Sequence, residues 1–151
     1  MHKKILAAII LAVVTAVTLC GCSSNALKGA KPITSDVFAQ RLTSLGFTAD
    51  GDHIITDSTC YVWRDDLTAY AYYTYATDAS ALIAFNDLTN SYEKTCRVNS
   101  MKANGQNKVW TGENDTMCYI VYRIDNTMIL GQAEIFDKKV CYDNVNKLVK
   151  G

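Results

Sequence analysis

Cysteine is the residue type in this sequence whose spacing points most directly to covalent chemistry. Six of the 151 residues are Cys, and two of them, Cys20 and Cys22, lie close together between an apolar run and a polar run. Leu19 stands three residues before Cys22, and Gly21 stands immediately before it. This order makes Cys22 the candidate for covalent modification. Cys20 suits this role less, because Leu19 rather than a small residue precedes it.

The residues ahead of Cys22 are organised like a secretory leader. Lys3 and Lys4 give it a positively charged start. Residues 5–19 are apolar apart from two Thr, and they include no Cys. That run is shorter than the roughly 20 residues that a helix needs to cross a bilayer. We therefore predict a leader over residues 1–21 and a lipidated Cys22, with an uncleaved signal anchor as the alternative.

The motif Leu19-Cys20-Gly21-Cys22 resembles the lipobox of bacterial lipoproteins. This resemblance implies acyl chains such as palmitate at Cys22 and a place on the outer face of the bacterial cell membrane. Two acyl chains make a durable anchor, whereas one is marginal. Residues 22–33 are then expected to form a polar tether between the lipid and a single domain over residues 34–151.

The other four cysteines could form disulfides. Outside the cytoplasm an even number of Cys favours paired thiols, and we pair Cys96 with Cys141 at helix ends and Cys60 with Cys118 in strands. The alternative is four buried thiols that behave as small apolar side chains. Cys-x-x-Cys spacing does not occur among these four, so we predict no metal site and no cofactor.

Acid and base groups for a hydrolase are scattered along the sequence. A hydrolase needs titratable groups that converge in a cleft, and no spacing here brings them together. The acids around Gly51 lack the spaced oxygens and the closing Glu of a calcium-binding loop. We therefore predict that the chain is not an enzyme. The candidates that a hydrolase would use are His53, Glu93, Glu113 and Glu134.

A run of tyrosines marks the candidate binding surface. In a strand over residues 67–76, Tyr70 and Tyr72 lie on one face and Tyr73 and Tyr75 on the other, because side chains alternate along a strand. One interpretation is cross-strand stacking within the sheet. The other is an aromatic binding surface on an open face of the sheet. The residues of this surface are Tyr61, Trp63, Tyr70, Tyr72, Tyr73 and Tyr75.

The periodicity of apolar residues predicts an α+β fold. Helices are expected over residues 35–45, 79–94 and 137–149, with strands over 60–64, 67–76, 108–111, 116–124 and 127–136. Asp125-Asn126 is expected to be a tight hairpin turn that needs positive φ. The order α-β-β-α-β-β-β-α predicts an antiparallel sheet of four to five strands with helices packed mainly on one face. Residues 98–107 are polar and predict only a strand followed by a long loop.

Charge and length limit the function. Without Lys3 and Lys4 the mature chain has 13 basic and 15 acidic residues, from 15 of each in the whole sequence. A net charge near −2 with no basic stripe argues against a nucleic-acid partner. The 130 residues that follow the leader are enough for one hydrophobic core.

Several segments together carry a wider resemblance: the leader motif, residues 34–36 and 45–47, the hairpin 122–127 and the helix from Asp137. They resemble small lipoproteins of Gram-positive gut bacteria that have no assigned function, and the resemblance implies no known active site. We expect a non-enzymatic, membrane-anchored module that binds an envelope protein or ligand. The alternatives are a cell-envelope hydrolase and an accessory subunit of a secretion or sporulation assembly.

Overall fold

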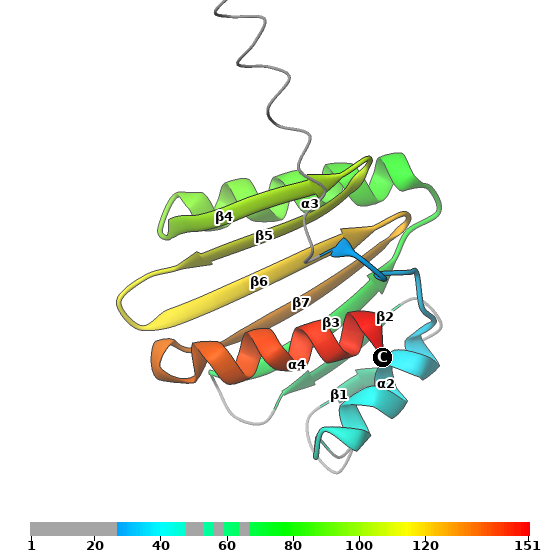
Figure 1. Cartoon of the computed structure of the whole chain (residues 1–151), viewed down its shortest axis with the longest axis horizontal. Coiled ribbons are helices and arrows are strands. Elements are labelled where there is room, and N and C mark those ends of the chain that lie inside the picture. The colour runs from blue at the N-terminus through cyan, green and yellow to red at the C-terminus, as the bar shows by residue number, and fades with distance from the viewer. Residues whose placement is uncertain (1–26, 48–52, 56–58, 64–66) are drawn as a thin grey trace, which may run out of the picture.

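The computed structural model describes residues 27–47, 53–55, 59–63 and 67–151, with the backbone alone for 53–55 and 59–63. The expected leader and Cys22 lie outside these residues. The helices are α2 (Ser35–Ser44), α3 (Asp78–Glu93) and α4 (Lys138–Lys150), with a 3₁₀ turn, η3 (Ile135–Asp137), ahead of α4. The strands are β1 (His53–Ile55), β2 (Thr59–Trp63), β3 (Ala69–Thr74), β4 (Arg97–Asn104), β5 (Asn107–Glu113), β6 (Met117–Ile124) and β7 (Thr127–Glu134) (Figure 1).

These strands form one antiparallel sheet in the order β1-β2-β3-β7-β6-β5-β4. The α+β class and the antiparallel sheet are confirmed, but the sheet has seven strands in the described residues rather than four to five. The additional strands are β1, for which the sequence predicts no strand, and β4, which occupies most of the polar segment 98–107, where the sequence predicts a strand followed by a long loop. The hairpin at Asp125-Asn126 is confirmed: Ile124 pairs with Thr127, and Asp125 has a φ of 49°.

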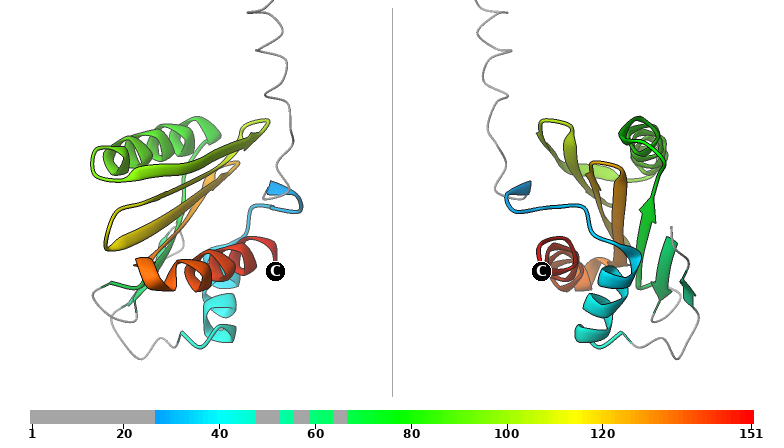
Figure 2. Two further views of the ribbon diagram at one scale, coloured as in Figure 1. Left: turned by 60° about the vertical axis from the view of Figure 1, so that its left-hand side comes forward. Right: turned by 90° about the vertical axis from the view of Figure 1, so that its right-hand side faces the viewer.

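The helices cover opposite faces of the sheet, and each covers only part of a face. Side chains of α3 pack over β5, β6 and β7 on one face, while α4 packs on β6 and β7 from the other (Figure 2). Helix α2 lies beside α4 and contacts β2 and β3. Two of the three described helices therefore share a face, here called the α4 face, and the third defines the α3 face.

The α4 face holds the larger core. Phe38 and Leu42 of α2 and Val145 and Leu148 of α4 are completely buried there. Gly131 on β7 allows the close approach of α4, because a Cβ at this position would lie 2.4 Å from Val145 Cγ2. A contact below about 3 Å is tighter than packed side chains tolerate, so the sheet can accept this helix only where it has no side chain.

The N-terminal segment adds to that same core. Leu27 is only 4% exposed and belongs to the α4-face cluster, and Ala30 and Ile33 pack against it. The domain therefore includes residues 27–33, which the sequence assigned to a polar tether over 22–33. Apolar side chains in this segment explain the difference, because burying Leu27 alone contributes about 1.5–3 kcal/mol relative to leaving it in water.

The α3 face holds a second, smaller cluster. Phe85 of α3 packs with Trp110, Val121 and Met128 of the sheet. The helix begins at an N-cap supplied by Thr77, whose hydroxyl accepts a hydrogen bond from the Ser80 N–H at 3.1 Å. The cap thus lies one residue before Asp78, the first residue of α3.

A buried arginine ties this helix to the sheet. Arg123 on β6 is completely buried, and its guanidinium donates to the backbone carbonyls of Asp78 and Gln106. Its Nε has no hydrogen-bond partner in the structure. A buried charge is costly unless it is hydrogen-bonded, so Arg123 needs both carbonyls. Because Asp78 begins α3 and Gln106 lies in the β4–β5 turn, Arg123 connects these two segments to β6.

Candidate binding groove

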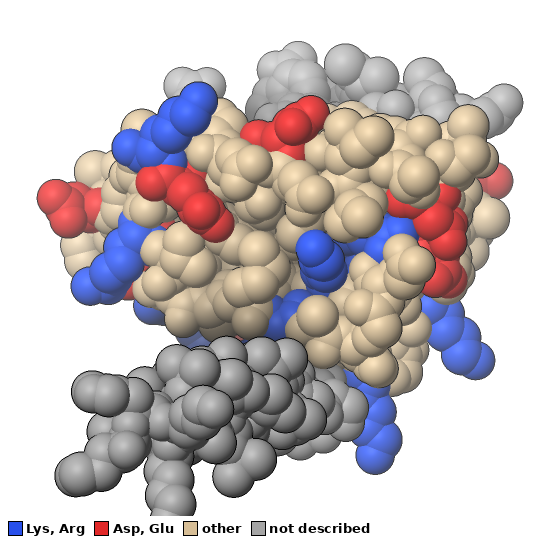
Figure 3. Space-filling model, turned by 90° about the horizontal axis from the view of Figure 1, so that it is seen from above, with Lys and Arg blue, Asp and Glu red and all other residues tan. Residues whose placement is uncertain are grey.

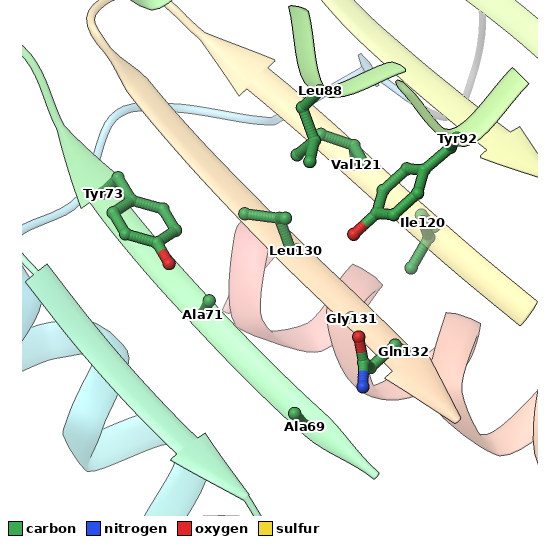
Figure 4. A pocket seen from close by; sticks show the side chains of 10 residues that line it. All are labelled: Ala69, Ala71, Tyr73, Leu88, Tyr92, Ile120, Val121, Leu130, Gly131 and Gln132. Atoms are coloured by element: carbon green, nitrogen blue, oxygen red, sulfur yellow. The ribbon is translucent and has the colours of Figure 1, made fainter. Parts of the chain in front are cut away.

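A groove of about 250 Å³ lies on the α3 face, beside the helix and over β3 and β7 (Figure 4). Its floor follows from the register of the two strands, in which Ala71 pairs with Leu130 and Ala69 with Gln132. The two Ala side chains are short, and both are buried at the floor of the groove. The lining residues are Ala69, Ala71, Tyr73, Leu88, Tyr92, Ile120, Val121, Leu130, Gly131 and Gln132.

Two tyrosines frame the groove from opposite sides. Tyr73 enters from β3 and Tyr92 from α3, and Figure 4 shows both hydroxyl groups pointing inward. Tyr92 is held by stacking on Tyr119, with ring centroids 4.4 Å apart, and on Trp110, with centroids 5.6 Å apart. Offset stacks of this kind stabilise an aromatic pair beyond the area that it buries. The position of the Tyr92 hydroxyl is therefore set before any ligand arrives.

Gln132 supplies the third polar group. Its Nε2 donates a long hydrogen bond of 3.5 Å to the Leu67 carbonyl, and a side-chain amide can both donate and accept. None of the lining residues is charged. The groove thus offers two phenol groups and one amide above an apolar floor, which is the lining of a site for an uncharged, partly apolar group.

The end of the molecule formed by α3 and β4 carries charges of both signs (Figure 3). At the end of the molecule formed by α3 and β4, acidic and basic side chains are interspersed rather than gathered by sign (Figure 3). Large uncharged areas separate them in this view. Steering of a charged ligand would need a patch of one sign, and the end of the molecule seen in Figure 3 does not present one.

The structure corrects part of the aromatic surface expected from sequence. Tyr70 and Tyr72 are 1% and 2% exposed and lie on the α4 face. The Tyr72 hydroxyl donates to the Ile33 carbonyl at 2.7 Å, and Asn144 donates to the Tyr70 hydroxyl at 3.1 Å. Both rings belong to the core because α2 and the segment before it cover this part of β3, so neither can belong to a binding surface.

Two of the other aromatic candidates, Tyr73 and Tyr75, lie on the α3 face. Tyr73 lines the groove, and Tyr75 is half-buried against the α3-face cluster. The backbone register pairs Tyr61 with Ala71 and Trp63 with Ala69. Residues directly opposite in an antiparallel pair share a face of the sheet. The side chains of Tyr61 and Trp63 lie outside the described part of the structure.

Glu113 is the most strongly perturbed of the candidate acids. Hydrogen bonds from Lys138, Asn99 and Arg97, of 2.7, 2.7 and 2.5 Å, lower its pKa to about 2. Arg97 and Asn99 come from β4 and Lys138 from the first turn of α4. A carboxylate that is this well satisfied is too weak a base to abstract a proton at neutral pH. The hydrogen bonds of Glu113 instead connect β5 to β4 and to α4.

The remaining acid and base candidates do not converge on the groove. Glu93 accepts a hydrogen bond from Trp110 Nε1 at 3.0 Å, and Glu134 is exposed at the end of β7. The side chain of His53 is outside the described residues. Among the described residues, no group of three or more His, Cys, Asp and Glu could hold a metal ion. No helix in the described part of the chain is long and apolar enough to span a membrane.

The cysteines lie in an arrangement that the sequence did not predict. Cys96 packs on the α3 face and Cys141 on the α4 face, so the expected pair Cys96–Cys141 is wrong, because the sheet separates the two thiols. The Cys141 thiol instead lies in hydrogen-bond contact with that of Cys118, which lowers the pKa of Cys118 and raises that of Cys141. The side chain of Cys60, the other expected partner of Cys118, is outside the described residues.

Comparisons with known proteins give no match: no family model matches the sequence, no curated protein matches it, and no solved structure matches the fold.

Proposed function

We propose that this chain is a non-enzymatic, lipid-anchored module on the outer face of a bacterial membrane. It binds an uncharged, partly apolar group of an envelope protein or ligand in the groove on the α3 face. The anchor rests on the motif that ends at Cys22. The binding role rests on one observation: the groove combines an apolar floor with the inward-pointing hydroxyls of Tyr73 and Tyr92.

The size of the groove limits what it can hold. Pockets for whole small molecules typically have volumes of about 300–1,000 Å³, whereas this groove has about 250 Å³. It suits one side chain, or one ring, of a larger molecule that continues across the surface. The small volume of the groove therefore favours a partner protein or an envelope polymer over a free metabolite. We expect such a partner to contact Tyr73 and Gln132 at the open side of the groove.

The position of Leu27 orients the groove relative to the anchor. Leu27 is buried on the α4 face, and only residues 23–26 separate it from Cys22. Five residue steps span at most about 18 Å, so the lipid would hold the domain close to the membrane by its α4 face. The groove opens on the opposite face and would be directed toward the envelope outside the membrane.

The anchor is tested by metabolic labelling of cells that produce the full chain. A fatty acid that carries an alkyne should label the wild-type chain and the Cys20→Ser variant, but not Cys22→Ser. Cys20→Ser is a matched control, because it removes a thiol that lies only two residues from Cys22. Equal labelling of wild type and Cys22→Ser would show that the anchor assignment is wrong.

The groove is tested by capture from the bacterium's own envelope. Tyr73→Ala and Tyr92→Ala should each lose the molecule that the wild-type chain retains. Phe136→Ala is the matched control, because it also removes an aromatic ring but from a side chain that is 95% exposed and outside the groove. If all four chains capture the same molecules in the same amounts, the groove is not the binding site.

A further inference from the structure

Two buried thiols outside the groove form a pair across the contact between α4 and the sheet. Cys118 on β6 and Cys141 in the second turn of α4 are 0% and 1% exposed and belong to the same core cluster. The Cys118 sulfur lies 3.4 Å from the Ala133 carbonyl oxygen. The Cys141 sulfur lies over Gly131, 3.2 Å from the position that a Cβ there would occupy.

These contacts place both sulfurs above the same two residues of β7. Gly131 and Ala133 are alternate residues and so lie on one face of the strand. Cys118 is directly opposite Ala133 in the register of β6 and β7, and the interaction between the two thiols lowers the pKa of Cys118 and raises that of Cys141. Both sulfurs are thiols in this structure. A disulfide needs a sulfur–sulfur distance of about 2.05 Å, so the two sulfurs must move together before the bond can form.

We propose that Cys118 and Cys141 form a disulfide when the chain folds outside the cytoplasm, and that this bond fastens α4 to the sheet. The oxidant is an external disulfide, such as oxidised glutathione or the disulfide of a thiol oxidoreductase. One thiolate attacks that disulfide and displaces one external thiol. The second thiolate then displaces the other, so the protein loses two protons and two electrons and the oxidant becomes two thiols.

Burial sets the order of events. An external disulfide must reach one of the two sulfurs, and in the folded domain neither is accessible. Oxidation therefore precedes the docking of α4 or needs its transient release. A chain that folds with its thiols reduced should consequently react slowly with the same oxidant, whereas a chain that refolds in its presence should react fully.

The bond is tested in vitro, independently of the anchor and the groove. The full chain, purified in mild detergent, is unfolded with reductant and refolded in a mixture of reduced and oxidised glutathione. Remaining thiols are then alkylated under denaturing conditions, and tryptic peptides are mapped by mass spectrometry. Trypsin places the four cysteines beyond Cys22 in the separate peptides 42–64, 95–97, 109–123 and 140–147.

The expected product is a cross-link between peptides 109–123 and 140–147, with Cys96 alkylated in full. Cys96→Ser should retain this cross-link, and Cys118→Ser and Cys141→Ser should each lose it. Reduction of the wild-type product should lower its Tm by about 6–12 °C, from the loop-closure entropy of a loop of this length. Full alkylation of both thiols after refolding, or cross-links that join 95–97 to 140–147 or 42–64 to 109–123, would overturn the proposal.

Discussion

The packing of α4 against Gly131 can be tested by adding a single methyl group. In Gly131→Ala the new Cβ would lie 2.4 Å from Val145 Cγ2 and 3.2 Å from the Cys141 sulfur. Overpacking of a core costs about 1–3 kcal/mol, and the gain from replacing Gly in a strand is about 0.5–1 kcal/mol. We therefore expect the free energy of unfolding to fall by about 1–2 kcal/mol.

A second substitution separates this collision from other effects of the methyl group. Val145→Ala removes the atoms that the new Cβ meets, and because Val145 is completely buried it should itself cost about 2 kcal/mol. In that background Gly131→Ala should be neutral or stabilising by up to about 1 kcal/mol. The two substitutions should thus show a coupling energy of about 2 kcal/mol, within the range measured for residues in contact.

The assay is urea-induced unfolding with reductant present, followed by fluorescence of the buried Trp110. The four chains of the cycle should have equal m-values, so that differences in midpoint report differences in stability. If Gly131→Ala costs the same in both backgrounds, Val145 is not the residue that it meets. In that case α4 would not lie where the structure places it, and the contact between Cys118 and Cys141 would lose its basis.

Three further predictions concern charges. Because Glu113 has a pKa of about 2 in the folded chain and an ordinary value of 4.5, it stabilises the folded state above about pH 4.5, and this contribution is lost as the pH falls toward 2. Glu113→Gln should therefore be about 2 kcal/mol less stable than wild type near pH 7 and nearly equal near pH 2 in urea unfolding; a constant difference would contradict the linkage. Arg123→Lys keeps the charge but can reach only one of the two carbonyls, so it should cost about 1.5–3 kcal/mol in the same assay, and an unchanged midpoint would show that the second hydrogen bond contributes nothing. Capture by the groove should be unaffected when the salt concentration rises from about 0.05 to 0.5 M, because the lining is uncharged and salt screens only interactions between charges. Loss of the captured molecule in high salt would place its binding outside the groove.

Local patterns in the sequence were sufficient for the central elements of the fold. The alternation along 116–124 and the Asp125-Asn126 turn predict the β6–β7 hairpin, because register follows from turn length and from the period of two. The apolar stripe that includes Phe85 and Leu88 predicts the buried side of α3. Each of these signals is contained within about a dozen residues, and tertiary contacts reinforce rather than oppose it.

Strand β4 shows where such patterns fail. It lies at the edge of the sheet, and seven of its eight residues are exposed. A strand that is exposed on both faces has no reason to alternate between apolar and polar residues. Lys102 and the shift in register between Val98 and Ser100 are common protections of a sheet edge against pairing with another chain. The same features explain why the sequence predicts a strand with a long loop here rather than a strand that continues to Asn104.

The groove and the thiol pair depend on contacts between distant parts of the chain. Alternation correctly divides the tyrosines of β3 between two faces, but it does not say which face α2 covers. Tyr72 is buried and Tyr73 lines the groove for that reason alone. Likewise, Cys141 lies near Cys118 because Gly131 has no side chain and α4 can pack closely on β7. No local spacing in the sequence predicts this packing.

Site-specific photo-crosslinking in the living bacterium tests the proposed binding role most directly. A photoreactive phenylalanine analogue placed at Gln132 lies in the groove, and the same residue placed at Phe136 lies four positions further along the chain on an exposed turn. Irradiation should give a discrete adduct from position 132, and this adduct should disappear when Tyr73→Ala is added. An adduct from position 136 alone, or none from 132 with the anchor intact, would contradict the proposal that the groove holds the partner.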